Sequence, residues 1–142
     1  MAEQQRYFDE VTEGDTAPEL STELTRTDLV TYAGASGDFN PMHHDDVQAK
    51  DAGLPSVFGH GMFTMGLLGT ALTDYVGVGN LRLYKVRFTK QTWPGEQLTT
   101  KITVAKKYEE GSEHRVDLEC EVVNADGEAK VAGTAVAALP SR

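Results

Sequence analysis

A short stretch in the first third of the chain holds the residue types that proton transfer requires. It reads Gly37-Asp38-Phe39-Asn40-Pro41-Met42-His43-His44-Asp45 and sets a carboxylate, Asp38, five residues before an imidazole, His43. Proline stiffens such a loop and glycine permits a turn, so both side chains can be aimed at one point. Because histidine exchanges protons near neutral pH, the stretch predicts an acid–base pair. The alternative is an ordinary turn, since Asp and Asn before Pro also bond to their own backbone.

A second stretch, Gly59-His60-Gly61-Met62, precedes a long apolar run. The first N–H groups of a helix have no partner within the helix and lie at its positive end. If the run is a helix, the Gly61 N–H is available to a carbonyl oxygen that becomes negative during a reaction. The alternative is a glycine-rich turn required only for packing. We expect His60 to be a structural histidine with satisfied hydrogen bonds.

Three helices are expected to position these stretches. The first covers residues 25–35, where Thr25 and Asp28 fit a reciprocal capping pattern. After a break, a short helix covers residues 45–52, and the main helix covers residues 61–76. Because apolar residues occupy nearly all sides of the main helix, we expect it to be buried on most sides. Upstream, residues 8–11 and 19–24 are predicted to be short extended segments around a turn.

Four segments with strand patterns follow the main helix. Apolar and polar residues alternate near residues 84–89, 98–104 and 115–122, and residues 131–139 form an alanine-rich fourth run. Turn signals separate the runs at Pro94-Gly95, Gly111-Ser112 and Asp126-Gly127. We expect a four-stranded antiparallel meander that buries its apolar face by wrapping around the main helix. The predicted class is α+β, with residues 1–142 forming a single domain.

The composition argues against several other classes of protein. The chain has 142 residues and a net charge of −9, which disfavours a nucleic-acid-binding surface. The single cysteine, Cys120, excludes an internal disulfide and a multi-cysteine zinc site and is typical of a reducing compartment. The sequence contains neither a recognisable secretory signal nor about 18 consecutive apolar residues, so we expect no membrane span and a cytoplasmic location.

Basic residues cluster between residues 75 and 108, where seven of them accompany a single acid, Glu96. They are either solvated strand faces or a dock for an anionic partner, such as coenzyme A or a phosphopantetheine carrier. The candidates for such a dock are Arg82, Lys85 and Arg87.

Residues 32–45 and the His60-Gly61-Met62 start of the main helix together resemble the signature of the MaoC-like (R)-specific hydratases. The later segments, with Arg87-Phe88 and Pro94-Gly95-Glu96, resemble the rest of that domain, so the resemblance covers essentially the whole chain. It implies a hot-dog fold, in which an antiparallel sheet wraps around a long central helix. Gly66 stands where several hydratases that act on coenzyme A esters have a serine. The run Gly-Met-Phe-Thr-Met-Gly is similar to the catalytic subunit of the actinobacterial type II fatty-acid-synthase dehydratase.

The resemblance also implies an activity and roles for individual residues. The family dehydrates (3R)-hydroxyacyl thioesters to trans-2-enoyl thioesters, or catalyses the reverse hydration. By the resemblance, Asp38 and His43 form the catalytic dyad, Asn40 holds and orients their loop, and the Gly61 N–H binds the thioester oxygen. The acyl group is carried on acyl carrier protein or coenzyme A, and neither a cofactor nor a metal is needed.

The same resemblance implies that the acyl channel lies between two hot-dog subunits, in a homodimer or in a heterodimer with a sister subunit. Two other functions stay open at this point. One is a non-catalytic partner subunit that binds acyl thioesters, and the other is a hot-dog acyl thioesterase.

Overall fold

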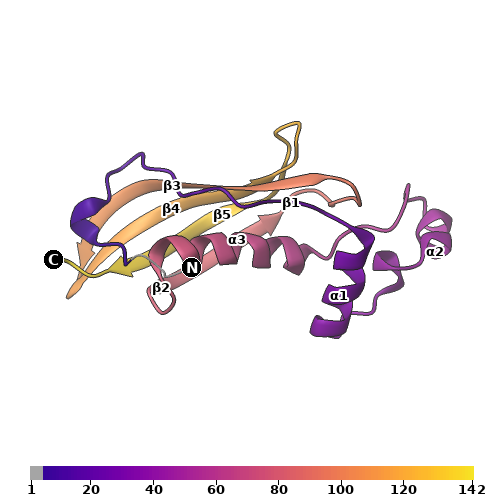
Figure 1. Ribbon diagram of the computed structural model, residues 1–142, viewed down its shortest axis with the longest axis horizontal. Helices are drawn as coiled ribbons and strands as arrows, with labels where there is room; N and C mark the ends of the chain where they lie inside the picture. Colours follow the sequence, from indigo (N-terminus) through magenta and orange to yellow (C-terminus); the bar gives the residue numbers. More distant parts are fainter. Residues whose placement is uncertain (1–4) are drawn as a thin grey trace.

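A five-stranded antiparallel sheet curves over one long helix in the computed structural model, which describes residues 5–142 (Figure 1). The helix, α3 (Gly61–Val76), begins and ends at the predicted residues and contacts β2, β3, β4 and β5. The sheet and the helix bury the main hydrophobic core between them, which includes Leu68 and Leu72 of α3. The arrangement confirms the predicted α+β class and the hot-dog fold.

The sheet is built from β1 (Ser21–Glu23), β2 (Leu81–Phe88), β3 (Gln97–Glu110), β4 (Glu113–Val123) and β5 (Ala129–Leu139). Its strand order is β1-β3-β4-β5-β2. The predicted alternation is confirmed in β3 and β4, whose inward residues are all buried: Leu98, Thr100, Ile102, Val104, Val116, Leu118, Cys120 and Val122. Because the two residue types face opposite sides of a strand, the alternating pattern set the side that packs against α3.

The predicted four-stranded meander is wrong for β2. Only β3, β4 and β5 are joined by tight turns, whereas β2 pairs antiparallel with β5 at the far edge of the sheet. The link between β2 and β3, residues 89–96, is longer than a tight hairpin turn. It runs from the β2 edge of the sheet to β3, which lies next to the opposite edge strand. The edge of β3 that does not pair with β4 pairs with β1. Gly133 permits the pairing with β5, because a Cβ at that position would lie 2.0 Å from the Lys85 carbonyl oxygen.

Helix α3 is buried on one side only, which corrects the prediction that it is buried on most sides. The side that faces the sheet is buried, but Met62 is 55% exposed and Phe63, Met65 and Leu67 are partly exposed. The sheet covers a single face of the helix, so the remaining apolar residues lie at the surface of the chain. Within residues 5–142, no helix combines the length and the apolar character that crossing a membrane requires.

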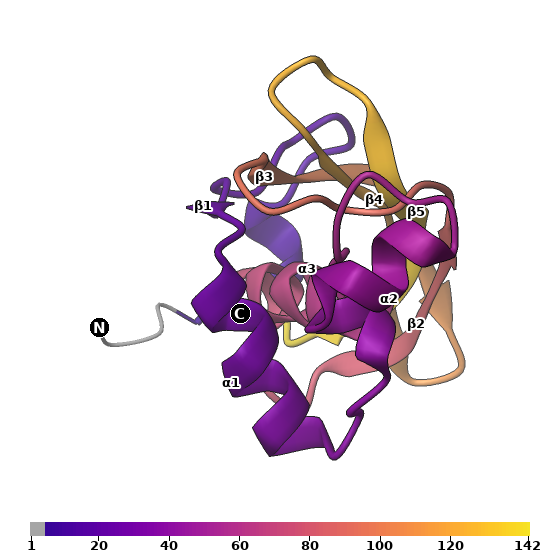
Figure 2. The same cartoon turned by 90° about the vertical axis from the view of Figure 1, so that its right-hand side faces the viewer.

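Two further helices, α1 (Arg26–Ser36) and α2 (Asp46–Asp51), lie together beyond the N-terminal end of α3 (Figures 1 and 2). The predicted capping of α1 is confirmed, because the Thr25 side chain and the Asp28 side chain each accept from the other residue's backbone N–H. Asp45 caps α2. Both helices are connected to the loop that carries the candidate acid–base pair, so they hold it beside the start of α3.

The prediction for residues 8–11 is wrong, because Phe8–Glu10 form a turn of 3-10 helix. The Phe8 ring stacks on His114, with ring centroids 4.9 Å apart, and the Phe8 N–H donates to the Pro140 carbonyl. Packing against the end of the sheet therefore replaces strand pairing in this segment. The second extended segment is confirmed in part, as β1.

Candidate active site

The loop between α1 and α2 is fixed by its own side chains. Helix α1 ends at Gly37, whose φ of 75° is a conformation that glycine adopts without strain. The Asn40 N–H donates to Asp38 Oδ1 over 3.2 Å, and the Asn40 side-chain oxygen accepts from the Met42 N–H over 3.1 Å. That second bond caps the 3-10 turn Pro41–His43. The capping that could explain the motif as a simple turn is therefore present, and it also sets the position of His43.

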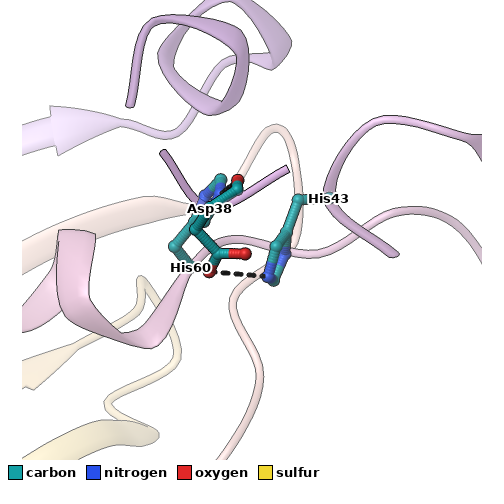
Figure 3. Close-up of side chains that lie close together, drawn as sticks. All are labelled: Asp38, His43 and His60. Carbon is teal, nitrogen blue, oxygen red and sulfur yellow. Dashed lines mark hydrogen bonds and ion pairs between the residues drawn. The ribbon is translucent and has the colours of Figure 1, made fainter. Parts of the chain in front are cut away.

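The same loop brings the two predicted acid–base residues together. Asp38 Oδ2 lies 3.9 Å from His43 Nε2, and Figure 3 shows the carboxylate directed at the imidazole ring. This separation is too long for a direct hydrogen bond. It leaves both atoms able to contact a third atom placed between them. The Asp38 side chain is half exposed, whereas the His43 side chain is buried.

His43 is held by a neighbouring main chain. Its Nδ1–H donates to the Phe58 carbonyl oxygen over 2.6 Å, and its ring meets the edge of the Phe58 ring. Phe58 lies outside the recognisable motifs, and a carbonyl oxygen is present at every position, so its role could not be read from the residue types. His44, the neighbour of His43, is exposed and points away to bond with the Phe39 carbonyl.

His60 lies next to both members of the pair. Its Nε2–H donates to the main-chain carbonyl of Asp38 over 3.1 Å, and its ring stacks on His43 with centroids 3.9 Å apart. Burial lowers the pKa of His60 and outweighs the opposing effect of the bond to Asp38. The sequence interpretation of His60 as a satisfied structural histidine is thus incomplete. His60 Nδ1 is buried without a hydrogen-bond partner among the described residues.

A cleft of about 550 Å³ opens in front of the pair and reaches the first turn of α3. Gly61 is the first residue of α3, lies in the cleft wall and is exposed, so packing does not close this end of the helix. Phe88 of β2 borders the cleft beside Gly61. The first N–H groups of α3 and its positive end therefore face the same space as the Asp38 and His43 side chains.

The inner wall of the cleft contains a buried lysine. Lys130 Nζ contacts the Gln91 carbonyl at 2.9 Å and carboxylate oxygens of Glu96 and Glu128 at 3.0 Å each. Burial alone raises the pKa of Glu96, but bonds from Asn124, Lys130 and the Trp93 N–H outweigh it and lower that pKa. The lysine charge is thus paired, and it joins the β2–β3 link to the start of β5.

Two threonines in the cleft wall have buried hydroxyls without a partner among residues 5–142. They are Thr64 of α3 and Thr92 of the β2–β3 link. Thr70 and Thr73 of the same helix instead donate to the carbonyls of Gly66 and Gly69. An unsatisfied buried hydroxyl costs about 1–3 kcal/mol.

Among residues 5–142, Asp38, His43 and His60 form the group that could hold a metal ion, because each offers one ligand atom within 4.8 Å of the others. Two imidazoles and a carboxylate suit several transition metals. However, the two rings are stacked at an interplanar angle of 29°, which directs their in-plane lone pairs side by side and not toward one point. The arrangement therefore fits an acid–base pair better than a chelating site.

The three residues of the predicted basic dock differ in whether their charge is paired. Arg82 forms an ion pair with Glu113 at 2.8 Å and also donates to the Gly79 carbonyl, so its charge is compensated. Lys85 and Arg87 are exposed on β2. Lys90 and Lys101 pair with Glu128 and Glu19. Three of the seven basic residues are thus paired with carboxylates, while Lys85 and Arg87 of the candidate dock stay exposed.

Comparison with known proteins gives one family for this chain. Residues 8–125 match the model of the MaoC-like domain. An (R)-specific enoyl-CoA hydratase of Rhodospirillum rubrum is 26% identical over 96% of the chain and 93% of its own length. The unliganded R-hydratase of Pseudomonas aeruginosa superposes with a TM-score of 0.84 at 28% identity, over 96% of this chain and 86% of that one.

The 3-hydroxyacyl-thioester dehydratase Y of Mycobacterium tuberculosis is 42% identical, over 55% of this chain. The matched part is 28% of that longer relative, so the chain corresponds to a fraction of its length. The match to the family model includes the loop of Asp38 and His43 and the whole of α3. The chain therefore belongs to the MaoC-like family.

Proposed function

We propose that this chain catalyses the reversible dehydration of (3R)-hydroxyacyl thioesters to trans-2-enoyl thioesters. The observation that carries the proposal is the approach of Asp38 Oδ2 to His43 Nε2, 3.9 Å apart at the edge of the cleft. The names of the relatives, an (R)-specific enoyl-CoA hydratase and a 3-hydroxyacyl-thioester dehydratase, support the same chemistry.

In the dehydration direction, the C2–H bond and the C3–O bond break, C2=C3 forms and water leaves. His43 is placed to take the C2 proton, because its Nδ1–H is engaged by Phe58 and its lone pair is on Nε2. Asp38 faces the position of the C3 oxygen, and the pair together returns one proton to that oxygen as it departs. In hydration, the pair orients and activates a water molecule in the same position.

The thioester oxygen gains negative charge when the C2 proton is removed. The Gly61 N–H, at the positive end of α3, is our candidate for binding that oxygen, as in the oxyanion holes of acyl-transfer enzymes. Loss of one such donor commonly costs about 2.7–4 kcal/mol of barrier. Asn40 contributes by capping the 3-10 turn that sets His43.

The acyl group is proposed to arrive on coenzyme A or on the phosphopantetheine arm of a carrier protein. A second hot-dog subunit, identical or a sister, is our candidate for covering the exposed apolar side of α3. Met62 and Phe88, which border the cleft, are 55% and 54% exposed, and burial of such residues stabilises an assembly. Mass measurement of the purified chain, alone and with candidate sister subunits, tests this part of the proposal.

The reaction itself is tested with an enoyl-CoA and the purified chain in its native assembly. Absorbance of the conjugated enoyl thioester and free thiol are followed together. Loss of absorbance without thiol release supports the hydratase. Release of thiol means a thioesterase, and neither change, in the presence of every candidate partner, means a binding subunit; both of these outcomes contradict the proposal.

A further inference from the structure

We propose that His60 is a positioning residue that holds both members of the Asp38–His43 pair in register. The inference rests on the proposed function of that pair. It comes from contacts that His60 makes with two different parts of the loop: the main chain of Asp38 and the ring of His43.

The first contact fixes the start of the loop. His60 Nε2–H donates to the Asp38 carbonyl oxygen over 3.1 Å, across 22 residues of sequence. The carbonyl belongs to the residue whose carboxylate faces His43, so the bond limits movement of the main chain from which that carboxylate projects. Figure 3 shows His60 beside Asp38, with the His43 ring facing the carboxylate.

The second contact fixes the imidazole. The rings of His60 and His43 stack with centroids 3.9 Å apart and planes inclined by 29°. The bond from His43 Nδ1 to Phe58 sets one edge of the ring, and stacking on His60 sets one of its faces. A Tyr32 ring of α1 packs against His60 at 4.8 Å, so His60 is itself held in place.

A purely structural explanation for this histidine is weaker. His60 occupies the N-cap position of α3, yet its side chain makes no capping bond to the helix. It is 1% exposed, and its Nδ1 is buried without a partner among the described residues. An apolar side chain would fill the same space without that unsatisfied atom. The two contacts with the pair are what a histidine adds here.

The position also requires His60 to stay neutral. A second positive charge stacked on protonated His43 would oppose the proton transfer that the reaction needs. Burial lowers the pKa of His60, which favours its neutral form. Asp38 has a carboxylate oxygen within 4.8 Å of a ring nitrogen of each histidine, and the charge of Lys130 in the same cleft is paired with Glu96 and Glu128.

Two substitutions separate the two contacts, and a third serves as a control. His60→Phe keeps a ring for stacking and removes the donor to Asp38, whereas His60→Gln supplies a donor and removes the ring. His44→Phe is the matched control, because His44 makes the same kind of bond, to the Phe39 carbonyl at 3.1 Å, but is exposed and does not touch the pair. The assay is enoyl-CoA hydration, with kcat and KM determined separately.

We expect His60→Phe to lower kcat by about 10²-fold with little change in KM, as small misplacements of reacting groups do. His60→Gln should recover part of that loss, and His44→Phe should stay within about twofold of the unmodified chain. Backbone amide hydrogen exchange of residues 38–43, which does not depend on activity, should be faster in His60→Phe than in the control. If that exchange is unchanged in both His60 variants, or if His60→Phe keeps its kcat, the positioning role is wrong.

The exchange measurement also separates this inference from the proposed function. If the unmodified chain shows no hydratase activity while exchange in residues 38–43 still rises in His60→Phe, then the function is wrong and the positioning of the loop stands. If the unmodified chain is active but exchange in residues 38–43 does not change in His60→Phe, the positioning role of His60 is wrong and the proposed function stands.

Discussion

The Nδ1–H of His43 donates to the carbonyl oxygen of Phe58, and this bond determines which nitrogen of His43 can act as a base. A carbonyl only accepts, so the proton of neutral His43 is on Nδ1 and the lone pair is on Nε2. That nitrogen is the one that faces Asp38. The bond comes from the main chain that leads into α3, so the tautomer does not depend on the Asp38 carboxylate.

His43→Ala and Asp38→Asn are each expected to lower the hydration rate by about 10²–10⁴-fold, the range typical of a lost acid–base group. The fold should persist, because the loop is also held by Asn40, by His60 and by the Phe58 N–H, which donates to the Met42 carbonyl. Steady-state kinetics and circular dichroism of the purified variants measure the two effects. His44→Ala is the control and should be nearly silent; a large loss there, with an active His43→Ala, would show that the wrong histidine was chosen.

Gly61→Pro tests the oxyanion role of the main chain. Proline is well accepted at the first residue of a helix, and His60, with ψ of 130°, has the backbone conformation that must precede it. The substitution removes the N–H donor, and kcat should fall by about 10²–10³-fold. Gly61→Ala is the control, because it adds a Cβ beside Phe88 and keeps the N–H. Equal losses in both variants would assign the effect to crowding by Phe88.

Stability should fall in mild acid because of His60. Burial holds the pKa of folded His60 below its ordinary value of 6.5. At a pH between the pKa of folded His60 and about 6.5, the unfolded chain binds more protons than the folded chain. The free energy of unfolding therefore decreases as pH falls below about 6.5. Urea unfolding at a series of pH values measures this dependence, and His60→Gln should show a shallower decline over the same range. Parallel curves for the two proteins would count against a protonation-sensitive His60.

Lys130→Met should destabilise the fold by about 3 kcal/mol, because it leaves Glu96 partly buried without its cation. The double variant Lys130→Met with Glu96→Gln should recover much of that loss. Urea denaturation checks both values. Lys90→Met removes an exposed partner of Glu128 and is a control, expected to cost less than about 1 kcal/mol.

Thr64→Val should raise the free energy of unfolding by about 1 kcal/mol, since it replaces a buried hydroxyl without a described partner by a methyl group of similar size. Thr70→Val is the control, because its exposed hydroxyl already donates to the Gly66 carbonyl. Thermal unfolding of both variants gives the comparison. A destabilised Thr64→Val would mean that the hydroxyl has a partner in solution.

Local sequence signals predicted much of the fold and part of the site. The bounds of α3, the Thr25–Asp28 capping pair and the buried alternation of β3 and β4 follow from neighbouring residues alone. The order of β2 in the sheet depends on which edge is free, and that is decided by β1, far away in sequence. The approach of Asp38 to His43 follows from a stiff loop. Their supports, the Phe58 carbonyl and the His60 ring, come from another segment and could not be read from spacing.

The two side-chain bonds that join His43 and His60 across the loop boundary end on main-chain oxygens, those of Phe58 and Asp38. Neither oxygen changes when a side chain is exchanged, so the carboxylate can be neutralised while the scaffold keeps its shape. Asp38→Asn protein should then serve as an inert trap, able to retain an acyl thioester long enough for the complex to be crystallised or captured from a mixture.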